Sequence, residues 1–131
     1  MTERCSRFRA KVALVFILNT TKNTVIAQKG VLADTFFSRM IGLLNRQSLL
    51  PGEALVITRC KSVHMLFMRF PIDAIFIDKN SHVVGLVERL LPFQFSRIFL
   101  KTSQVIEVPS GVIVQSRTAL DDKIEIKQAD N

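Results

Sequence analysis

The chain has 131 residues and a mass of 14.8 kDa, which fits one domain and excludes a pair of separate catalytic and cofactor domains. Hydrophobic residues make up 48% of it and the mean hydropathy is +0.27, so disorder, a collagen-like fibre and a disulfide-stapled miniprotein are excluded. The net charge of +7 is compatible with nucleic acid, anionic lipid or acidic partners.

The chain begins with a basic stretch in which four positive side chains outweigh Glu3: Arg4, Arg7, Arg9 and Lys11. We expect residues 1–11 to form a mobile, solvated tail and residues 12–131 to form a single β domain.

The basic tail and the apolar run that follows it resemble the first two regions of a signal peptide. The run at 12–18 is short, however, and no small-residue cleavage site lies next to it. No segment approaches the ~20 apolar residues that span a bilayer. We therefore predict a cytoplasmic location, with export or a periplasmic location through an atypical leader as the alternative. Cys5 and Cys60 are compatible with one disulfide, but two thiols are the simpler interpretation.

The segments 12–19 and 24–29 are rich in Val, Ile, Phe and Thr and are separated by four polar residues, which predicts a β-hairpin. From Asp34 onward, apolar residues recur at intervals of three and four. This periodicity predicts one short α-helix near residues 34–44, with Asp34 or Thr35 as its N-cap.

Short strands dominate the remainder, after a turn at Pro51 and Gly52. The stretch at 72–77 is apolar except for Asp73, which indicates a central strand covered on both faces. The absence of strand and helix alternation predicts a mainly β fold, an antiparallel β-sandwich or small barrel. The predicted strands are 54–58, 62–67, 72–78, 83–91, 104–108, 112–115 and 123–127.

Three motifs in the same order resemble an uncharacterised prokaryotic family, domain of unknown function 192. They are Arg-Met-Ile-Gly-Leu-Leu-Asn-Arg at 39–46, the stretch from His64 to Asp78, and Val-Ile-Glu-Val-Pro-Ser-Gly at 105–111. The resemblance implies a β-sandwich of jelly-roll-like topology with a short helix, and it implies no activity. One departure is Asp121, which stands where the family has glycine before Asp122. If that turn has a positive φ, aspartate tolerates it better than most residues.

Five residues within or beside these motifs are candidates for binding a ligand: Arg39, His64, Arg69, Asp73 and Glu107. Arginine donors suit a carboxylate or phosphate, and histidine transfers protons near neutral pH. Asp73 and Glu107 lie in apolar strands and need partners, so a structural role is the alternative for each. Alternation places Glu107 opposite the face of Ile106 and Val108, and an acid–base pair would require Asp73 and Glu107 to converge.

No spacing indicates a metal or cofactor site, since the chain has two histidines and no Cys-x-x-Cys pair. In one extended strand Cys60 and His64 would be about 13 Å apart, too far to share a metal or to act together as nucleophile and base.

The sequence favours a non-catalytic module that binds a small polar or anionic ligand, such as a carbohydrate, in a cleft. A hydrolase that uses His64 with Asp73 or Glu107 is the enzymatic alternative. A third hypothesis is an accessory or interaction module of an envelope or secretion system. Nucleic-acid binding rests on charge alone, because no recognition motif is present and all ten aromatic residues are Phe.

Overall fold

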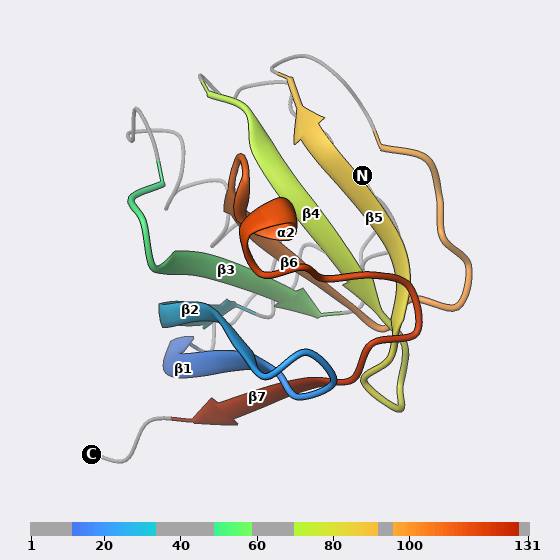
Figure 1. Cartoon of the computed structure of the whole chain (residues 1–131), viewed down its shortest axis with the longest axis horizontal. Helices are drawn as coiled ribbons and strands as arrows, with labels where there is room; N and C mark the ends of the chain where they lie inside the picture. Colours follow the sequence, from blue (N-terminus) through green and yellow to red (C-terminus); the bar gives the residue numbers. More distant parts are fainter. Residues whose placement is uncertain (1–11, 34–48, 59–69, 92–95, 129–131) are drawn as a thin grey trace.

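The computed structural model describes residues 12–33, 49–58, 70–91 and 96–128. Strands dominate these residues, and one four-residue helix accompanies them (Figure 1). The elements in chain order are β1 (Val12–Asn19), β2 (Thr24–Ala33), β3 (Glu53–Thr58), β4 (Ile72–Ile77), β5 (Val83–Leu90), β6 (Gln104–Pro109), α2 (Val112–Gln115) and β7 (Ile124–Gln128). The mainly β prediction is confirmed.

All seven strands belong to one curled sheet in the order β5-β4-β6-β3-β2-β1-β7, which forms a half-barrel (Figure 1). Neighbouring strands are antiparallel except β2 and β3, which are parallel. The predicted hairpin at 12–29 is β1 and β2, although β2 continues to Ala33.

The two outer strands of the sheet, β5 and β7, approach each other at one end. His82 and Lys123 form an isolated antiparallel bridge there. The Val83 N–H donates to the Asp122 carbonyl, and the Ile124 N–H donates to the Ser81 carbonyl, both at 2.9 Å. These bonds join the β4–β5 turn to the start of β7, so the curled sheet is closed at this end.

The sheet buries side chains on both faces. One face, which we call the α2 face, packs residues such as Ile17, Ile75 and Ile106 against Ile113 of α2. The opposite face holds a second cluster that includes Phe76, with Phe99 packed against it. Strand β4 lies between β5 and β6 and all six of its residues are buried, which confirms the predicted central strand.

The prediction of a strand at 112–115 is wrong, because these residues form α2. Val-Ile-Val favours strands by propensity. Here Gly111 takes a left-handed conformation with φ 103°, which turns the chain, and a buried carboxylate accepts hydrogen bonds from the first turn of the helix. The helix at 34–44 and the strand at 62–67 lie outside the described residues. In the part of the chain that the structure describes, no helix is long and apolar enough to cross a membrane.

Candidate functional site

The first turn of α2 is held by Asp73, which projects from β4 onto the α2 face. Its Oδ2 accepts hydrogen bonds from the backbone N–H groups of Gly111 and Ile113, both at 3.0 Å. Its Oδ1 accepts a hydrogen bond of 2.8 Å from the Arg89 N–H of β5. The side chain is 1% exposed, so these bonds replace its hydration. The N-cap residue of this four-residue helix is Gly111, which has no side chain to cap the helix. Asp73 supplies the capping hydrogen bonds from strand β4.

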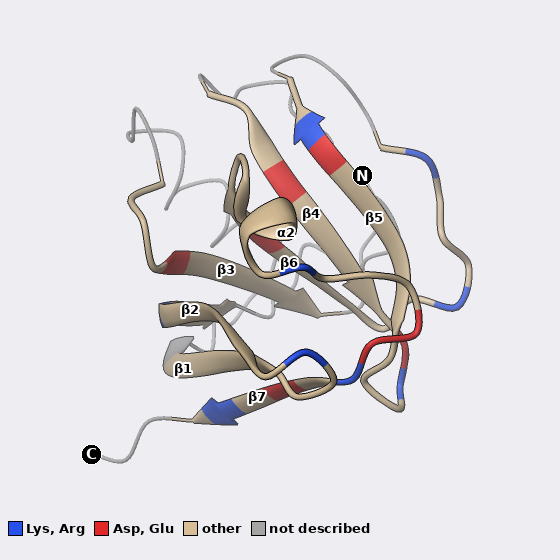
Figure 2. Ribbon diagram, viewed as in Figure 1, with Lys and Arg blue, Asp and Glu red and all other residues tan. Residues whose placement is uncertain are grey.

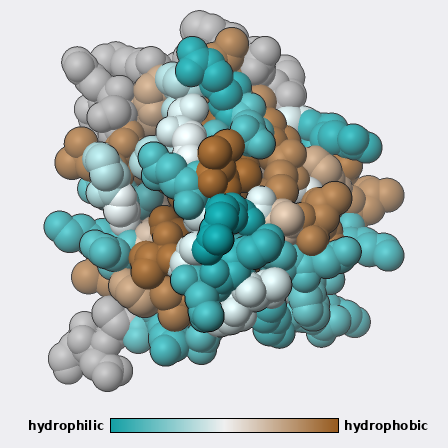
Figure 3. Space-filling model, viewed as in Figure 1, coloured by the Kyte–Doolittle hydropathy of each residue, from teal (hydrophilic) through white to brown (hydrophobic). Residues whose placement is uncertain are grey.

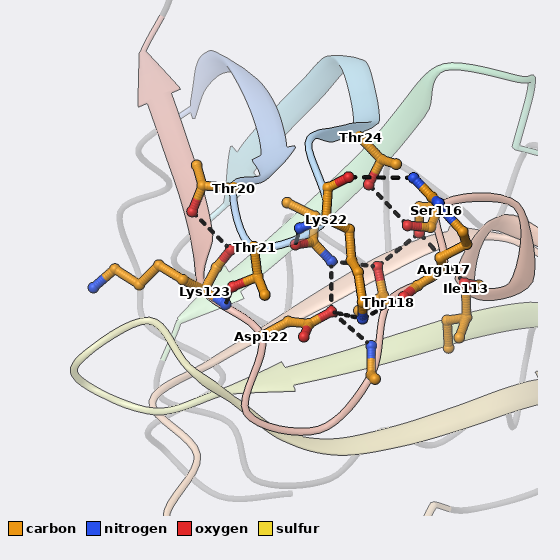
Figure 4. A network of polar contacts seen from close by, with 12 residues as sticks. Thr20, Thr21, Lys22, Thr24, Ile113, Ser116, Arg117, Thr118, Asp122 and Lys123 are labelled. Carbon is orange, nitrogen blue, oxygen red and sulfur yellow. Dashed lines mark hydrogen bonds and ion pairs between the residues drawn. The ribbon is translucent and has the colours of Figure 1, made fainter.

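The last turn of α2 is held by hydroxyl groups (Figure 4). Ser116 Oγ donates to the Val112 carbonyl at 2.8 Å, so the Thr118 hydroxyl, 2.7 Å away, donates to Ser116 Oγ. Asn19 Nδ2 in turn donates to Thr118 Oγ1 at 3.1 Å, and Thr24 Oγ1 donates to the Ser116 carbonyl at 2.8 Å. The β1–β2 hairpin therefore fixes the position of α2 through a continuous chain of hydrogen bonds.

Asp122 is the charged centre of this network (Figure 4). Its Oδ2 accepts hydrogen bonds from Asn19 Nδ2 at 2.9 Å, Lys22 Nζ at 2.8 Å and the Ala119 N–H at 2.9 Å. Burial of the carboxyl raises its pKa, but these hydrogen bonds and the charge of Lys22 outweigh that effect and hold the pKa of Asp122 below its ordinary value. The carboxylate is thus ionised at neutral pH, with three donors on one of its oxygens, which fits a structural role.

A cleft of about 350 Å³ lies between α2, β2 and the turn before β3. The described residues that line it have apolar side chains or neutral polar ones, and none of these residues is charged. Figure 3 shows hydrophobic side chains over both α2 and β2 on this face. The lining residues are Val25, Ile26, Ala27, Gln28, Pro51, Gly52, Val112, Gln115 and Ser116.

The wall of the cleft that α2 forms is fixed at both ends. Asp73 binds the N–H groups of its first turn, and Thr24 and Thr118 bind Ser116 after its last residue. Buried polar groups that are all hydrogen-bonded make a structure rigid. The α2 wall of the cleft is therefore held in a fixed position.

The structure does not bring Asp73 and Glu107 together. They lie on neighbouring strands, but Asp73 pairs with Val108 and Glu107 pairs with Ala74. Paired residues share a face, and Val108 belongs to the α2 face while Ala74 belongs to the opposite face. Glu107, 0% exposed, therefore points away from Asp73, as the alternation of its strand predicts. The two carboxylates do not form an acid–base pair, and neither lines the cleft.

The other candidate residues, Arg39, His64 and Arg69, lie outside the described residues, as do Cys5 and Cys60. Among the described residues no group of three or more His, Cys, Asp or Glu side chains could hold a metal ion.

Most residues of the network and of the cleft were not predicted from the sequence. Asn19, Lys22 and Thr24 look like an ordinary polar hairpin loop, since their partners are more than 90 positions away in sequence. The one available signal was Asp122, which the family pattern places before the last strand.

The model of the DUF192 family, described as "Uncharacterized ACR, COG1430", matches residues 16–126. The chain belongs to this family. The DUF192 match spans the hairpin, the central strands, α2 and most of β7, so the network and the cleft both lie within the family domain.

Relatives agree with the DUF192 assignment, and solved structures share the fold. A UPF0127 protein of Thermococcus sibiricus is 35% identical over 83% of this chain and 73% of its own length. A UPF0127 protein of Pyrococcus furiosus is 34% identical over 83% of this chain and 96% of its own. A crystal structure of a protein of unknown function from Novosphingobium aromaticivorans has a TM-score of 0.68 at 18% identity, covering 95% of this chain and 98% of that one.

A second solved structure, of a candidate transcription regulator from Sinorhizobium meliloti, also has a TM-score of 0.68. It is 17% identical and covers 92% of this chain and 98% of that chain. At this identity the two crystal structures show the shared fold alone.

The departure from the DUF192 pattern at Asp121 falls in a turn of the kind that glycine favours. Asp121 has a φ of 72°, in the left-handed region. Its N–H donates to the Val83 carbonyl at 2.9 Å, within the bonds that close the sheet. Aspartate is one of the residues that tolerate this conformation, so the turn is retained without glycine.

Proposed function

We propose that this DUF192 protein is a non-catalytic binding module that holds a small, neutral, polar ligand in the cleft between β2 and α2. The observation that carries the proposal is the cleft itself, of about 350 Å³, with an α2 wall held by buried hydrogen bonds. Its volume lies in the range of small-molecule sites, roughly 300–1,000 Å³.

The lining favours a ligand with both hydrogen-bonding groups and an apolar surface. Gln28 and Gln115 offer amide donors and acceptors on opposite sides of the cleft, one on β2 and one on α2. Val25, Pro51 and Val112 offer apolar contact. A carbohydrate unit or another neutral compound with hydroxyl or amide groups has this combination.

The charge of the described lining residues supports one of the two ligand classes that the sequence favours. An anionic ligand would need a cation, and none of the described residues that line the cleft is a lysine, an arginine or a histidine. None of the described lining residues is titratable, so they offer contacts for binding and no general acid or base.

The test is a thermal-shift screen of the full chain against neutral sugars, nucleosides, amides and organic acids. A compound at 100 times its Kd stabilises the fold by about 2.7 kcal/mol, which raises Tm by several degrees. We expect neutral compounds to give such a shift and Gln115→Ala or Gln28→Ala to reduce it. Gln128→Ala, at the exposed end of β7, is the matched control and should keep the full shift.

The opposite pattern would refute the assignment of the cleft. In that pattern organic acids alone stabilise the protein, and Arg39→Ala or His64→Ala abolishes the effect while Gln115→Ala does not. The ligand would then bind at Arg39 or His64 and not in this cleft.

A further inference from the structure

The segment 96–103, between β5 and β6, is anchored to the sheet at its middle. The Phe99 ring packs against Phe76 with ring centroids 4.4 Å apart. It also lies against Gly85, where an added Cβ would be 2.4 Å from a Phe99 ring carbon. The Thr102 N–H donates to the Phe99 carbonyl, and the Ser103 N–H donates to the Ile77 carbonyl. The Phe99 ring and the backbone that follows it are therefore held in place.

Inward anchoring of Phe99 leaves its two apolar neighbours in solvent. Ile98 is 62% exposed and Leu100 is 76% exposed, and with Val114 they are the most exposed large apolar side chains of the described residues. Contact of these two aliphatic side chains with water is unfavourable. Covering them with another apolar surface would lower the free energy.

Basic side chains flank the apolar pair at both ends. Arg97 and Lys101 are exposed, and Figure 2 shows the positive positions at either end of this loop. The Arg97 guanidinium lies 5.3 Å from the Phe99 ring centroid. Within the described part of the chain the one ion pair joins Lys22 and Asp122, so no described carboxylate neutralises Arg97 or Lys101.

We propose that residues 97–101, which we call the 97–101 loop, dock on the surface of an anionic lipid bilayer. Ile98 and Leu100 enter the boundary between headgroups and acyl chains, while Arg97 and Lys101 contact lipid phosphates. Apolar side chains beside lysine and arginine are the pattern of segments that lie in this interface. Only two residues of each kind take part, so the binding is reversible and is weakened by salt.

The same features disfavour other macromolecules. A specific protein interface buries about 800 Å² on each partner, far more than two aliphatic side chains supply. Nucleic-acid phosphates would satisfy Arg97 and Lys101 but would leave Ile98 and Leu100 in water.

The first experiment is co-sedimentation of the full chain with phosphatidylcholine vesicles, with and without phosphatidylserine. The basic N-terminal residues also attract anionic vesicles, so the decisive comparison keeps the charge constant. In the double variant Ile98→Gln with Leu100→Gln we expect the partition constant to fall at least about tenfold. Val114→Gln, which changes an equally exposed side chain on α2, should bind as wild type does.

The second experiment measures insertion directly. The chain contains no Trp and no Tyr, so a single introduced Trp reports without background. We expect the emission of Leu100→Trp to shift to the blue with anionic vesicles and that of Val114→Trp to stay unchanged.

Three results would overturn the proposal: a wild-type protein that stays in solution with anionic vesicles, a double variant that binds as tightly as wild type, or Trp emission that does not distinguish the two positions. A wild type that ignores vesicles but forms a dimer that the double variant loses would make the 97–101 loop a protein interface.

Discussion

Replacement of Asp73 by asparagine tests whether a strand carboxylate holds α2 in place. Asparagine has nearly the shape of aspartate, but one carboxylate oxygen becomes an NH2 group that cannot accept a hydrogen bond. If that group faces Arg89, one N–H loses its acceptor, and if it faces α2, the N–H groups of Gly111 and Ile113 both lose theirs. No orientation of the amide satisfies all three donors.

The expected cost follows from these bonds. A hydrogen bond to a charged group contributes about 1.5–3 kcal/mol, so Asp73→Asn should destabilise the fold by about 2–3 kcal/mol. Asp73→Ala leaves all three N–H groups without this acceptor and should cost about 3–5 kcal/mol. These values are a large fraction of the roughly 5–15 kcal/mol that stabilises a typical domain.

Urea unfolding followed by circular dichroism measures the effect, since the chain lacks Trp and Tyr for fluorescence. For a slope of about 1–3 kcal/mol/M, the midpoint of Asp73→Asn should fall by about 1–2 M. Asp121→Asn is the matched control, because Asp121 is exposed and asparagine also accepts a positive φ, so its midpoint should stay close to wild type. An unchanged midpoint for Asp73→Asn would refute the conclusion that Asp73 holds α2.

Two further predictions concern Asp122 and Gly85. The folded pKa of Asp122 lies below its ordinary value of 3.8, so its contribution to stability is complete above that pH and is lost as the pH falls through 3.8 towards the folded pKa. Unfolding midpoints taken from neutral to acid pH should therefore decline more steeply for wild type than for Asp122→Asn. In Gly85→Ala the added Cβ overlaps the Phe99 ring, which should destabilise the fold by about 1–3 kcal/mol and lower Tm. Phe99→Leu in the same chain should reduce the cost of that alanine.

Each of these has a clear contrary result. Parallel pH profiles for wild type and Asp122→Asn would mean that Asp122 does not gain its hydrogen bonds on folding. If the destabilisations of Gly85→Ala and Phe99→Leu are additive in the double variant, the alanine Cβ does not clash with the Phe99 ring.

Local sequence determined most of the strands. The hairpin of β1 and β2 and the buried strand β4 follow from β-branched and apolar runs separated by turn residues, and both are confirmed. The alternation of β6 also placed Glu107 on the face away from Ile106 and Val108. Such features depend on residues within a few positions of one another, which is why a sequence without a structure reveals them.

The motifs of the sequence also determined the family, and the glycine of the family pattern anticipated the turn at Asp121. Its φ of 72° is the conformation that a glycine position implies. In contrast, the family motifs did not indicate the cleft, because it is built from β2, α2 and a turn rather than from one motif.

Only the tertiary structure decided the state of residues 112–115 and the composition of the site. Val-Ile-Val alone predicts a strand, but Asp73, 40 positions before Ile113, accepts hydrogen bonds that stabilise the first turn of a helix. Asn19 and Asp122, 103 positions apart, meet because β7 returns to the hairpin end of the sheet. Secondary-structure propensity depends on neighbours in sequence. A buried carboxylate needs hydrogen-bond donors, which can come from any part of the fold. At α2 this requirement outweighs the strand propensity of Val-Ile-Val.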